Sequence, residues 1–377
     1  MSRVYLDYNA SAPMRPEAIE AMNRAFAAPG NPSSVHAAGR AARAMVEDAR
    51  NAVAALIGGP ASTVVFTSGG TEANALAIES AVATGSRRLI VSAIEHDSVL
   101  ENAKASGAAV ELLPVNAHGV ADLGWLAERL SRWDAADGRP FVALMHANNE
   151  TGVIQPVREA SEIVRAADGW LHVDAVQSAG KIPTDSRALG ADTLTASAHK
   201  LGGPQGVGAL TFGPRATLVR RQHGGGQERG RRAGTENVAG IAGFGAAALA
   251  ALKDRDIDPA PRDAAIARLT ATGAVVMGEG ALRLPNTLCV ALPGWGAELQ
   301  VMQLDLAGIM VSAGSACSSG KVKASHVLSA MGQGDLAACA IRVSGGWATT
   351  PEDWAAFAAA WEEIQSRHAA RHRAPAA

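Results

Sequence analysis

The sequence is poor in cysteine, in aromatic residues and in net charge. Three cysteines in 377 residues argue against a disulfide framework, and because no two form a Cys-x-x-Cys pair, a thiolate zinc site is not expected. Aromatic residues make up 4% of the chain and the net charge is −2, which argues against a surface for nucleic acid. No apolar run approaches the roughly 18 residues of a membrane span, and no signal-peptide pattern opens the chain, so we expect a cytoplasmic protein that does not contact membranes.

Short runs rich in valine, isoleucine and leucine alternate with longer helical patterns. Strands are predicted at 63–67, 89–93, 110–113, 141–145, 171–174, 193–196 and 208–212. Helices are predicted at 16–27, 37–57, 72–82, 98–105, 123–133 and 157–166. This alternation predicts an α/β fold with a mainly parallel, doubly wound sheet of seven strands.

A second region follows an alanine-rich helix that is expected from about 233 to 252. The charged stretch at 253–262 contains two prolines and marks the likeliest boundary. Beyond it we expect a smaller α+β domain with strands near 286–292 and 309–312, helices near 298–305 and 351–365, and a frayed end from 367 onwards. The prediction is a large domain at 14–252 and a small domain formed by 1–13 and 253–377.

Polar residues directly follow five of the predicted strands. They occupy 68–72, 95–97, 146–152, 174–177 and 197–200. In open α/β sheets ligands bind beyond the carboxyl ends of the strands, so these residues are expected to converge on one site. Each stretch alone could equally be a turn or a helix cap.

Lys200 is one of only six lysines, and the other five lie among polar or turn residues. A lysine amine can lose its proton and form a Schiff base with a carbonyl. The alternative, non-catalytic role for Lys200 is a surface ion pair with a carboxylate. Gly70 and Thr71 lie between a strand and a helix, as in a phosphate seat. Asp174 is suited to stand beside a ring nitrogen and keep it protonated. An amine, a phosphate seat and a buried carboxylate together favour pyridoxal 5′-phosphate as the cofactor.

Four further residues are assigned around this cofactor. His96 is expected to stack on the ring and move protons, and Gln177 to bond the ring hydroxyl. Ser197 and His199 flank Lys200 and are expected to add to the phosphate seat. No metal ligand set is expected.

With these motifs in order, the chain resembles the cysteine desulfurases of the class-V aminotransferase family. The stretches that carry the resemblance are 6–10, 69–74, 148–152, 172–177 and 197–204. The resemblance implies fold type I of the pyridoxal phosphate-dependent transferases, a homodimer, and release of sulfur from L-cysteine as an enzyme persulfide, leaving alanine.

The resemblance also assigns further site residues. It implies Cys317 as the residue that takes the sulfur, Arg342 as the partner of the substrate carboxylate, and Asn149 as a contact of cofactor and substrate. Thr235 is implied to reach the phosphate of the partner subunit. The spacing after Cys317 resembles the subgroup with an extended cysteine loop, which hands sulfur directly to acceptor proteins such as an iron–sulfur scaffold. The other two cysteines, Cys289 and Cys339, are expected to be inert core thiols.

Several features depart from the family. Ala75 stands where asparagine is frequent, 345–347 is Gly-Gly-Trp, 254–285 is short, and no long tail follows. They bear on which acceptor docks rather than on the cofactor. The alternatives that stay open are a selenocysteine lyase or related β-eliminase, an ordinary aminotransferase, and a non-catalytic partner protein on the same fold.

Overall fold

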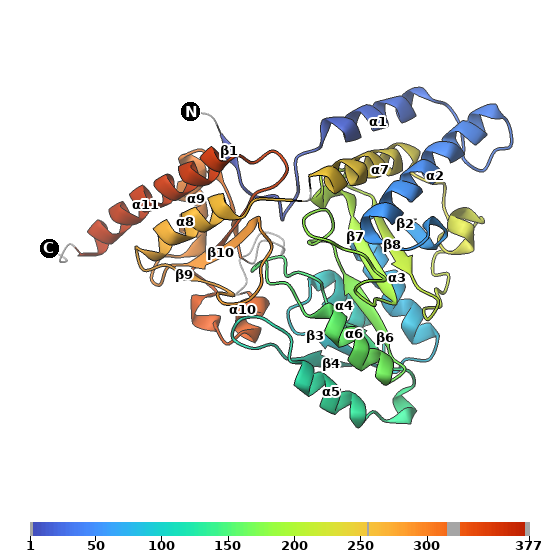
Figure 1. Ribbon diagram of the computed structural model, residues 1–377, viewed down its shortest axis with the longest axis horizontal. Helices are drawn as coiled ribbons and strands as arrows, with labels where there is room; N and C mark the ends of the chain where they lie inside the picture. Colours follow the sequence, from blue (N-terminus) through green and yellow to red (C-terminus); the bar gives the residue numbers. More distant parts are fainter. Residues whose placement is uncertain (1–2, 255, 315–324, 374–377) are drawn as a thin grey trace.

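The computed structural model describes residues 3–254, 256–314 and 325–373, the last three of these by their backbone alone. Its largest sheet has seven strands in the order β2-β8-β7-β6-β5-β3-β4 (Figure 1). The strands are β2 (Val64–Thr67), β3 (Arg88–Ser92), β4 (Ala109–Leu113), β5 (Phe141–Ala143), β6 (Trp170–Asp174), β7 (Thr193–Ser197) and β8 (Gly208–Phe212). Strand β8 is antiparallel to both its neighbours and the other pairings are parallel, which confirms the predicted mainly parallel sheet.

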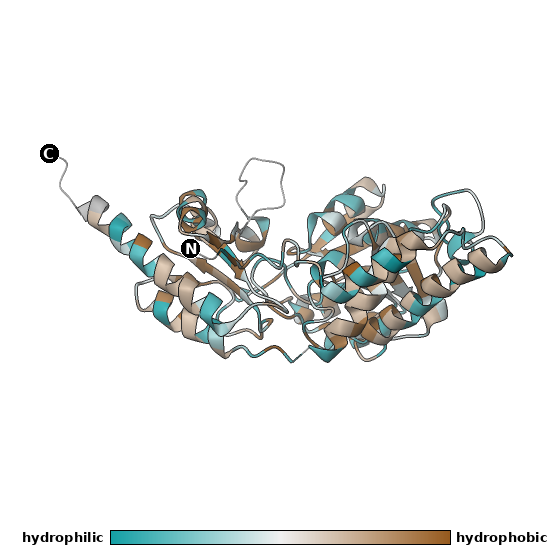
Figure 2. Ribbon diagram, turned by 90° about the horizontal axis from the view of Figure 1, so that it is seen from above, coloured by the Kyte–Doolittle hydropathy of each residue, from teal (hydrophilic) through white to brown (hydrophobic). Residues whose placement is uncertain are grey.

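Helices cover both faces of this sheet, and this explains why its strands read as continuous apolar runs. One face packs against α2 (Ala37–Ile57), α5 (Leu123–Ser131), α6 (Val157–Ala166) and α7 (Val238–Lys253). The opposite face packs against α3 (Gly70–Ala83) and α4 (Asp97–Ala105). Helix α1 (Pro16–Ala27) lies against α7. Figure 2 shows the hydrophobic strands enclosed between helices that carry hydrophilic residues on their outer sides.

A smaller sheet has its own core. Its order is β12-β13-β10-β9, and a separate pair joins β1 to β11. The strands are β1 (Val4–Tyr5), β9 (Val275–Val276), β10 (Thr287–Ala291), β11 (Ile309–Met310), β12 (Ser312–Ala313) and β13 (Ala340–Ser344). The helices are α8 (Ala260–Thr270), α9 (Ala297–Leu306), α10 (His326–Ala330) and α11 (Pro351–Arg373). Because β1 pairs with β11, the chain starts beside the smaller sheet and then crosses to the larger one.

Three sequence-based expectations are wrong in detail. Helix α7 begins at Val238 rather than near 233, because the Asn237 side chain caps it by accepting from Gly240 N at 3.0 Å. The strand expected at 309–312 is two short strands in different sheets. The end expected to fray from 367 continues α11 to Arg373. His368 stacks on Trp295 with ring centroids 5.4 Å apart, and this contact helps to hold the added turns.

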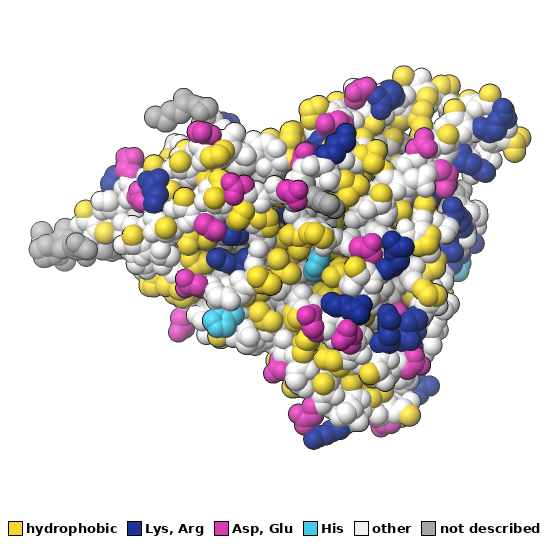
Figure 3. All heavy atoms as spheres, viewed as in Figure 1, with side chains coloured by type: hydrophobic (Ala, Val, Ile, Leu, Met, Phe, Trp, Pro, Cys, Tyr) yellow, Lys and Arg dark blue, Asp and Glu magenta, His cyan; other side chains and the backbone are white. Residues whose placement is uncertain are grey.

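The described part of the chain contains no helix both long enough and apolar enough to cross a membrane. On the face shown in Figure 3, acidic and basic side chains are interspersed and apolar side chains gather near the middle.

Candidate active site

A cavity of about 180 Å³ lies where the carboxyl ends of the large-sheet strands meet the start of α3. It contains most of the residues that the sequence singled out. Its lining is Gly70, Thr71, His96, Ser98, Met145, Asn149, Asp174, Val176, Gln177, Ser197, His199 and Lys200. The predicted convergence of strand ends on one site is therefore present in the fold.

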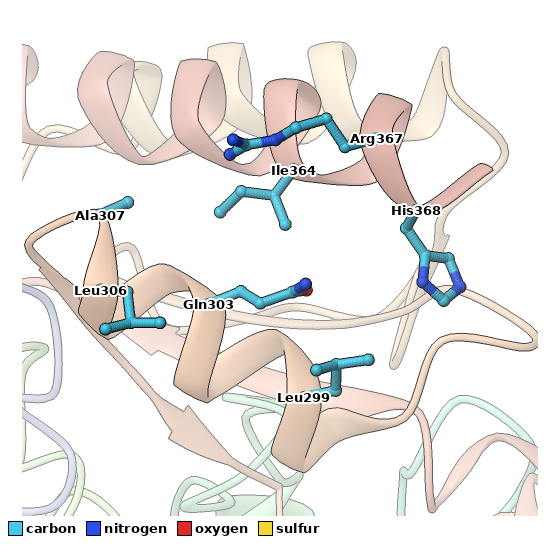
Figure 4. Close-up of a pocket in the computed structure, with 7 residues that line it drawn as sticks. All are labelled: Leu299, Gln303, Leu306, Ala307, Ile364, Arg367 and His368. Atoms are coloured by element: carbon cyan, nitrogen blue, oxygen red, sulfur yellow. The ribbon is translucent and has the colours of Figure 1, made fainter. Parts of the chain in front are cut away.

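A larger cavity, of about 460 Å³, lies between α9 and α11 (Figure 4). Figure 4 shows Leu299, Gln303 and Leu306 on one side and Ile364 and Arg367 on the other. Its lining includes neither a lysine nor a carboxylate. The smaller cavity is thus the candidate for chemistry.

The start of α3 has the features of a phosphate seat. Its N-cap residue, Gly69, makes no side-chain cap, and the first two residues of the helix, Gly70 and Thr71, line the cavity. A Cβ on Gly70 would lie 2.9 Å from Cγ2 of Val176, so a larger residue there would force Val176 or the helix start to shift. An uncapped helix start of this kind fits an anion.

Asp174 ends β6 and is held by neutral donors. Its Oδ2 accepts from the Asn74 amide at 2.8 Å and its Oδ1 accepts from Val176 N at 2.9 Å. These partners leave its negative charge available to a protonated ring nitrogen, the group that a carboxylate at this place would stabilise.

The Asn74 amide is oriented by a chain of buried donors behind it. Trp170 Nε1 donates to Thr193 Oγ1 at 2.9 Å, and Thr193 Oγ1 lies 3.0 Å from Nδ1 of His172. His172 Nε2 lies 3.0 Å from Asn74 Oδ1. Burial lowers the pKa of His172 to about 3, so the ring is neutral and can accept at Nδ1 while donating at Nε2. The chain therefore points the NH₂ group of Asn74 at Asp174.

Lys200 closes a short 3-10 helix (Ala198–Lys200) directly after β7. Its Nζ donates to the carbonyl oxygens of Asn9, at 2.6 Å, and Ala10, at 2.8 Å. Burial, followed by the charges of Lys200 and Lys181, lowers the pKa of His199 to about 4, so this histidine is neutral near pH 7. The amine thus lies in the cavity and is held by the segment that crosses from β1.

Lys181 lies in a turn, as the sequence indicates, but it is also buried, with 6% of its surface exposed. Its Nζ donates to Asn9 Oδ1 at 2.8 Å and to Gln177 Oε1 at 3.0 Å. Burial, with the nearby charges of Lys200 and Arg342, lowers its pKa well below the usual lysine value. Local sequence gave no indication of this, because one of its two acceptors, Asn9, is 172 residues away in the chain.

Arg342 lies on β13, next to the cavity but not in its lining. Nη2 donates to Asp7 Oδ1 at 3.0 Å and Nη1 donates to the Asn149 carbonyl at 3.2 Å. Its Nε is buried and has no hydrogen-bond partner among the described residues. An additional acceptor, such as a carboxylate, would satisfy this donor.

His96 caps α4. Its Nδ1 accepts from Ser98 N at 3.0 Å, while the ring lines the cavity. The capping contact uses Nδ1, and the side chain also forms part of the cavity wall.

Two buried glutamates near the site were not assigned from the sequence. Burial, followed by the charge of Asp174, raises the pKa of Glu95 well above its usual value. Burial raises the pKa of Glu150 to about 7, although it accepts from Ser325 Oγ at 2.6 Å. Each directly adjoins a predicted site residue, His96 or Asn149, which is the one signal the sequence offered.

Two predicted residues lie apart from the cavity. Thr235 lines a separate hollow with Ser68 and Arg232, so within one chain it does not meet Gly70 and Thr71. Cys317 lies outside the described residues. The assignments of both stay predictions. Cys289 is buried as expected, whereas Cys339 is only half-buried.

The comparisons with known proteins agree with this architecture. The class-V aminotransferase family description matches residues 4–357. A protein named cysteine desulfurase IscS from Dictyoglomus turgidum is 42% identical over 364 residues, covering 93% of this chain and 91% of that protein. A cysteine desulfurase from Cereibacter sphaeroides is 43% identical over 347 residues, covering 88% and 87%.

A solved structure of a NifS-like protein from Rickettsia africae superposes with a TM-score of 0.87 at 33% identity, covering 97% of this chain and 99% of that one. The family model spans nearly the whole chain, and the identities are well above those that show a fold alone. The resemblance expected from the sequence is confirmed: the chain belongs to the class-V aminotransferase family and groups within it with the cysteine desulfurases.

Proposed function

We propose that the protein is a pyridoxal phosphate-dependent cysteine desulfurase. It would convert L-cysteine to alanine and transfer the sulfur to its own Cys317 and then to an acceptor. The observation that carries the proposal is one cavity in which the Lys200 amine, the uncapped start of α3 and the Asp174 carboxylate meet. These are the three groups that hold the aldehyde, the phosphate and the ring nitrogen of this cofactor.

The proposal assigns a role to each cavity residue that the sequence singled out. When bound, pyridoxal phosphate withdraws electrons from the α-carbon of an amino acid. Lys200 would hold the cofactor and carry the α-proton, and Asp174 would keep a proton on the ring nitrogen. Gly70, Thr71, Ser197 and His199 would receive the phosphate. His96 would cover the ring and relay protons, and Gln177 would bond the ring hydroxyl.

Substrate binding is assigned to Arg342 and Asn149. The unpartnered Nε of Arg342 supports a carboxylate contact, because a bidentate bond to the guanidinium satisfies such a donor. The Cys317 thiolate would form an S–S bond as the C–S bond of the bound cysteine breaks, and protonation of the remaining carbon would give alanine.

The assembly and the acceptor belong to the proposal as well. A homodimer would bring Thr235 of one subunit to the phosphate seat of the other, and this is consistent with Thr235 lining a separate hollow within one chain. The acceptor would be a protein, for example an iron–sulfur scaffold. The expected cytoplasmic location stays a prediction.

The first test uses two active-site variants and one matched cysteine. Cys317→Ala should keep the visible cofactor absorbance and lose sulfide release and persulfide formation, whereas Cys339→Ala should keep both. Lys200→Ala should lose the absorbance of the lysine-bound cofactor. Desulfuration of cysteine at the wild-type rate by Cys317→Ala would overturn the proposal. Measuring the turnover of cysteine and of selenocysteine by the wild type and by Cys317→Ala distinguishes a selenocysteine lyase, because a lyase would not need Cys317.

The shared site can be tested with mixed dimers. Thr235→Ala and Lys200→Ala each damage a different half of the proposed site, so a dimer with one subunit of each retains one intact site. Mixing the two inactive variants should restore part of the activity. No recovery after demonstrated subunit exchange would contradict the contribution of Thr235 across the dimer.

A further inference from the structure

Behind the cavity lies a lysine that the proposed reaction does not use. Lys181 has no place among the groups that hold cofactor or substrate, yet its amine is buried and donates to two neutral side-chain amide oxygens, Asn9 Oδ1 and Gln177 Oε1. Two N–H groups are enough to donate to these two oxygens. The Lys181 amine can therefore make both hydrogen bonds whether it is charged or neutral, and burial favours the neutral form.

Lys181 determines which way the Gln177 amide faces. The oxygen of this amide accepts from Lys181, and its nitrogen donates to the Asn9 carbonyl at 2.9 Å. A flipped amide would place its oxygen against the Asn9 carbonyl oxygen, which loses that hydrogen bond and brings two acceptors together, and its NH₂ could no longer accept from the Lys181 amine. Gln177 lines the cavity, so this orientation fixes the face that it presents to a ligand.

Asn9 connects the same lysine to the rest of the site. Its carbonyl oxygen is also an acceptor for Lys200, and its side-chain NH₂ donates to the Asn149 carbonyl at 3.3 Å and to Thr287 Oγ1 at 3.0 Å. Its backbone N donates to Ser344 Oγ at 2.9 Å. The hydrogen bond from Lys181 therefore helps to fix the position of Asn9, which connects the Lys200 amine to the strands of the smaller sheet.

We propose that Lys181 is a positioning residue of the cofactor site, acting through the Gln177 amide and the Asn9 side chain. It touches neither cofactor nor substrate in this role. The inference rests on the proposed function, because it assumes that the cavity holds pyridoxal phosphate.

A double-mutant cycle tests whether Lys181 acts through Gln177. Lys181→Met keeps the length of the side chain and removes both donors, and Gln177→Met removes the amide. The readout is the dissociation constant of pyridoxal phosphate, obtained without turnover by visible absorbance as the cofactor is returned to protein from which it has been removed. Each single change should weaken binding about tenfold, the loss expected when a buried hydrogen bond is broken.

The decisive result is the effect of Lys181→Met in the Gln177→Met background. If Lys181 acts through Gln177, the loss there is smaller than in the wild type. An equal loss in both backgrounds, or no loss in the wild type, would overturn the inference. A purely structural role predicts the equal loss. If Lys181→Met does not fold, Lys181→Gln, which keeps an N–H donor, is used in the same cycle.

Two control variants exclude general effects of lost charge and lost stability. Lys104→Met removes an exposed lysine whose partner is Glu101, and Leu126→Ala creates a cavity in the core away from the site. Both should bind the cofactor as the wild type does. A wild type that does not bind pyridoxal phosphate would refute the proposed function and this inference with it, whereas normal binding by wild type and by Lys181→Met refutes this inference alone.

Discussion

Replacing Glu150 with glutamine should make the stability of the protein less dependent on pH. Glu150 lies at the loop after β5, is 4% exposed, and accepts a hydrogen bond from Ser325. Burial raises its pKa from 4.5 to about 7 in the folded chain. A glutamine keeps an oxygen acceptor for Ser325 and carries no titrating proton.

The sign and size of the effect follow from linkage. A carboxyl with a raised folded pKa binds its proton more tightly when folded, so its contribution to stability is complete below pH 4.5 and is lost as the pH rises through 7. The full loss is about 3 kcal/mol, at about 1.4 kcal/mol for each pH unit between the two pKa values. About 2 kcal/mol of it falls between roughly pH 5.5 and 8.5.

Urea unfolding of the wild type and of Glu150→Gln at those two pH values measures this directly. All other titrating groups are shared, so the difference between the two proteins isolates Glu150. Between the lower and the higher pH, the free energy of unfolding of the wild type should fall by about 2 kcal/mol more than that of Glu150→Gln. Infrared spectra should show a protonated carboxyl band that is lost near pH 7 in the wild type and absent from the variant. Parallel pH dependence of the two proteins would refute the reasoning.

Three further predictions concern the remaining buried polar groups. Arg50→Met should lower the free energy of unfolding, measured by denaturant titration, by about 3–5 kcal/mol, because it leaves the buried Glu228 carboxylate without its ion-pair partner. Arg132→Met, which removes one partner of an exposed ion pair, should lower it by less than about 1 kcal/mol. Asn74→Leu should weaken cofactor binding about tenfold or more in an absorbance titration, because it removes a donor to Asp174 and leaves His172 Nε2 unpaired. Unchanged affinity would show that the hydrogen bonds behind Asp174 are not needed for cofactor binding. Burial raises the pKa of Cys289, so iodoacetamide should not modify it in the native protein but should do so after denaturation, as mass spectrometry can follow.

The sequence predicted most of what forms the cavity, for a physical reason. Each of its strands carries its polar residues immediately after a buried apolar run, and parallel strands bring those residues to one edge. Lys200, Asp174 and Gly70 were therefore located by local pattern alone. The doubly wound sheet followed from the same pattern, and the strand and helix ends differ by a few residues where a side-chain cap or a tertiary contact determines them.

The groups behind the cavity could not be predicted in this way. Lys181 stands in a polar stretch that resembles a surface turn, and its burial depends on Asn9, 172 residues away. Asn74 lies on a helix of low amphipathicity, where nothing local distinguishes a bond to Asp174 from a packing role. The raised pKa of Glu150 likewise depends on residues brought together only by folding. Local sequence pattern therefore indicates residues whose role depends on their neighbours in the chain, but not residues whose role depends on their neighbours in space.

The crossing of the N-terminal segment also determines when the site can form during synthesis. Asn9 bonds Ser344, which is 335 residues away, and β1 needs β11 as its partner. The ribosome releases the first ten residues long before these strands exist, so the carbonyl acceptors of Lys200 reach their final positions only when the chain is nearly complete. Long-range pairing of this kind is slow to form, and capture of the cofactor should therefore be among the last events of folding. A truncated or stalled chain that lacks β13 should remain colourless even if its seven-stranded sheet has formed.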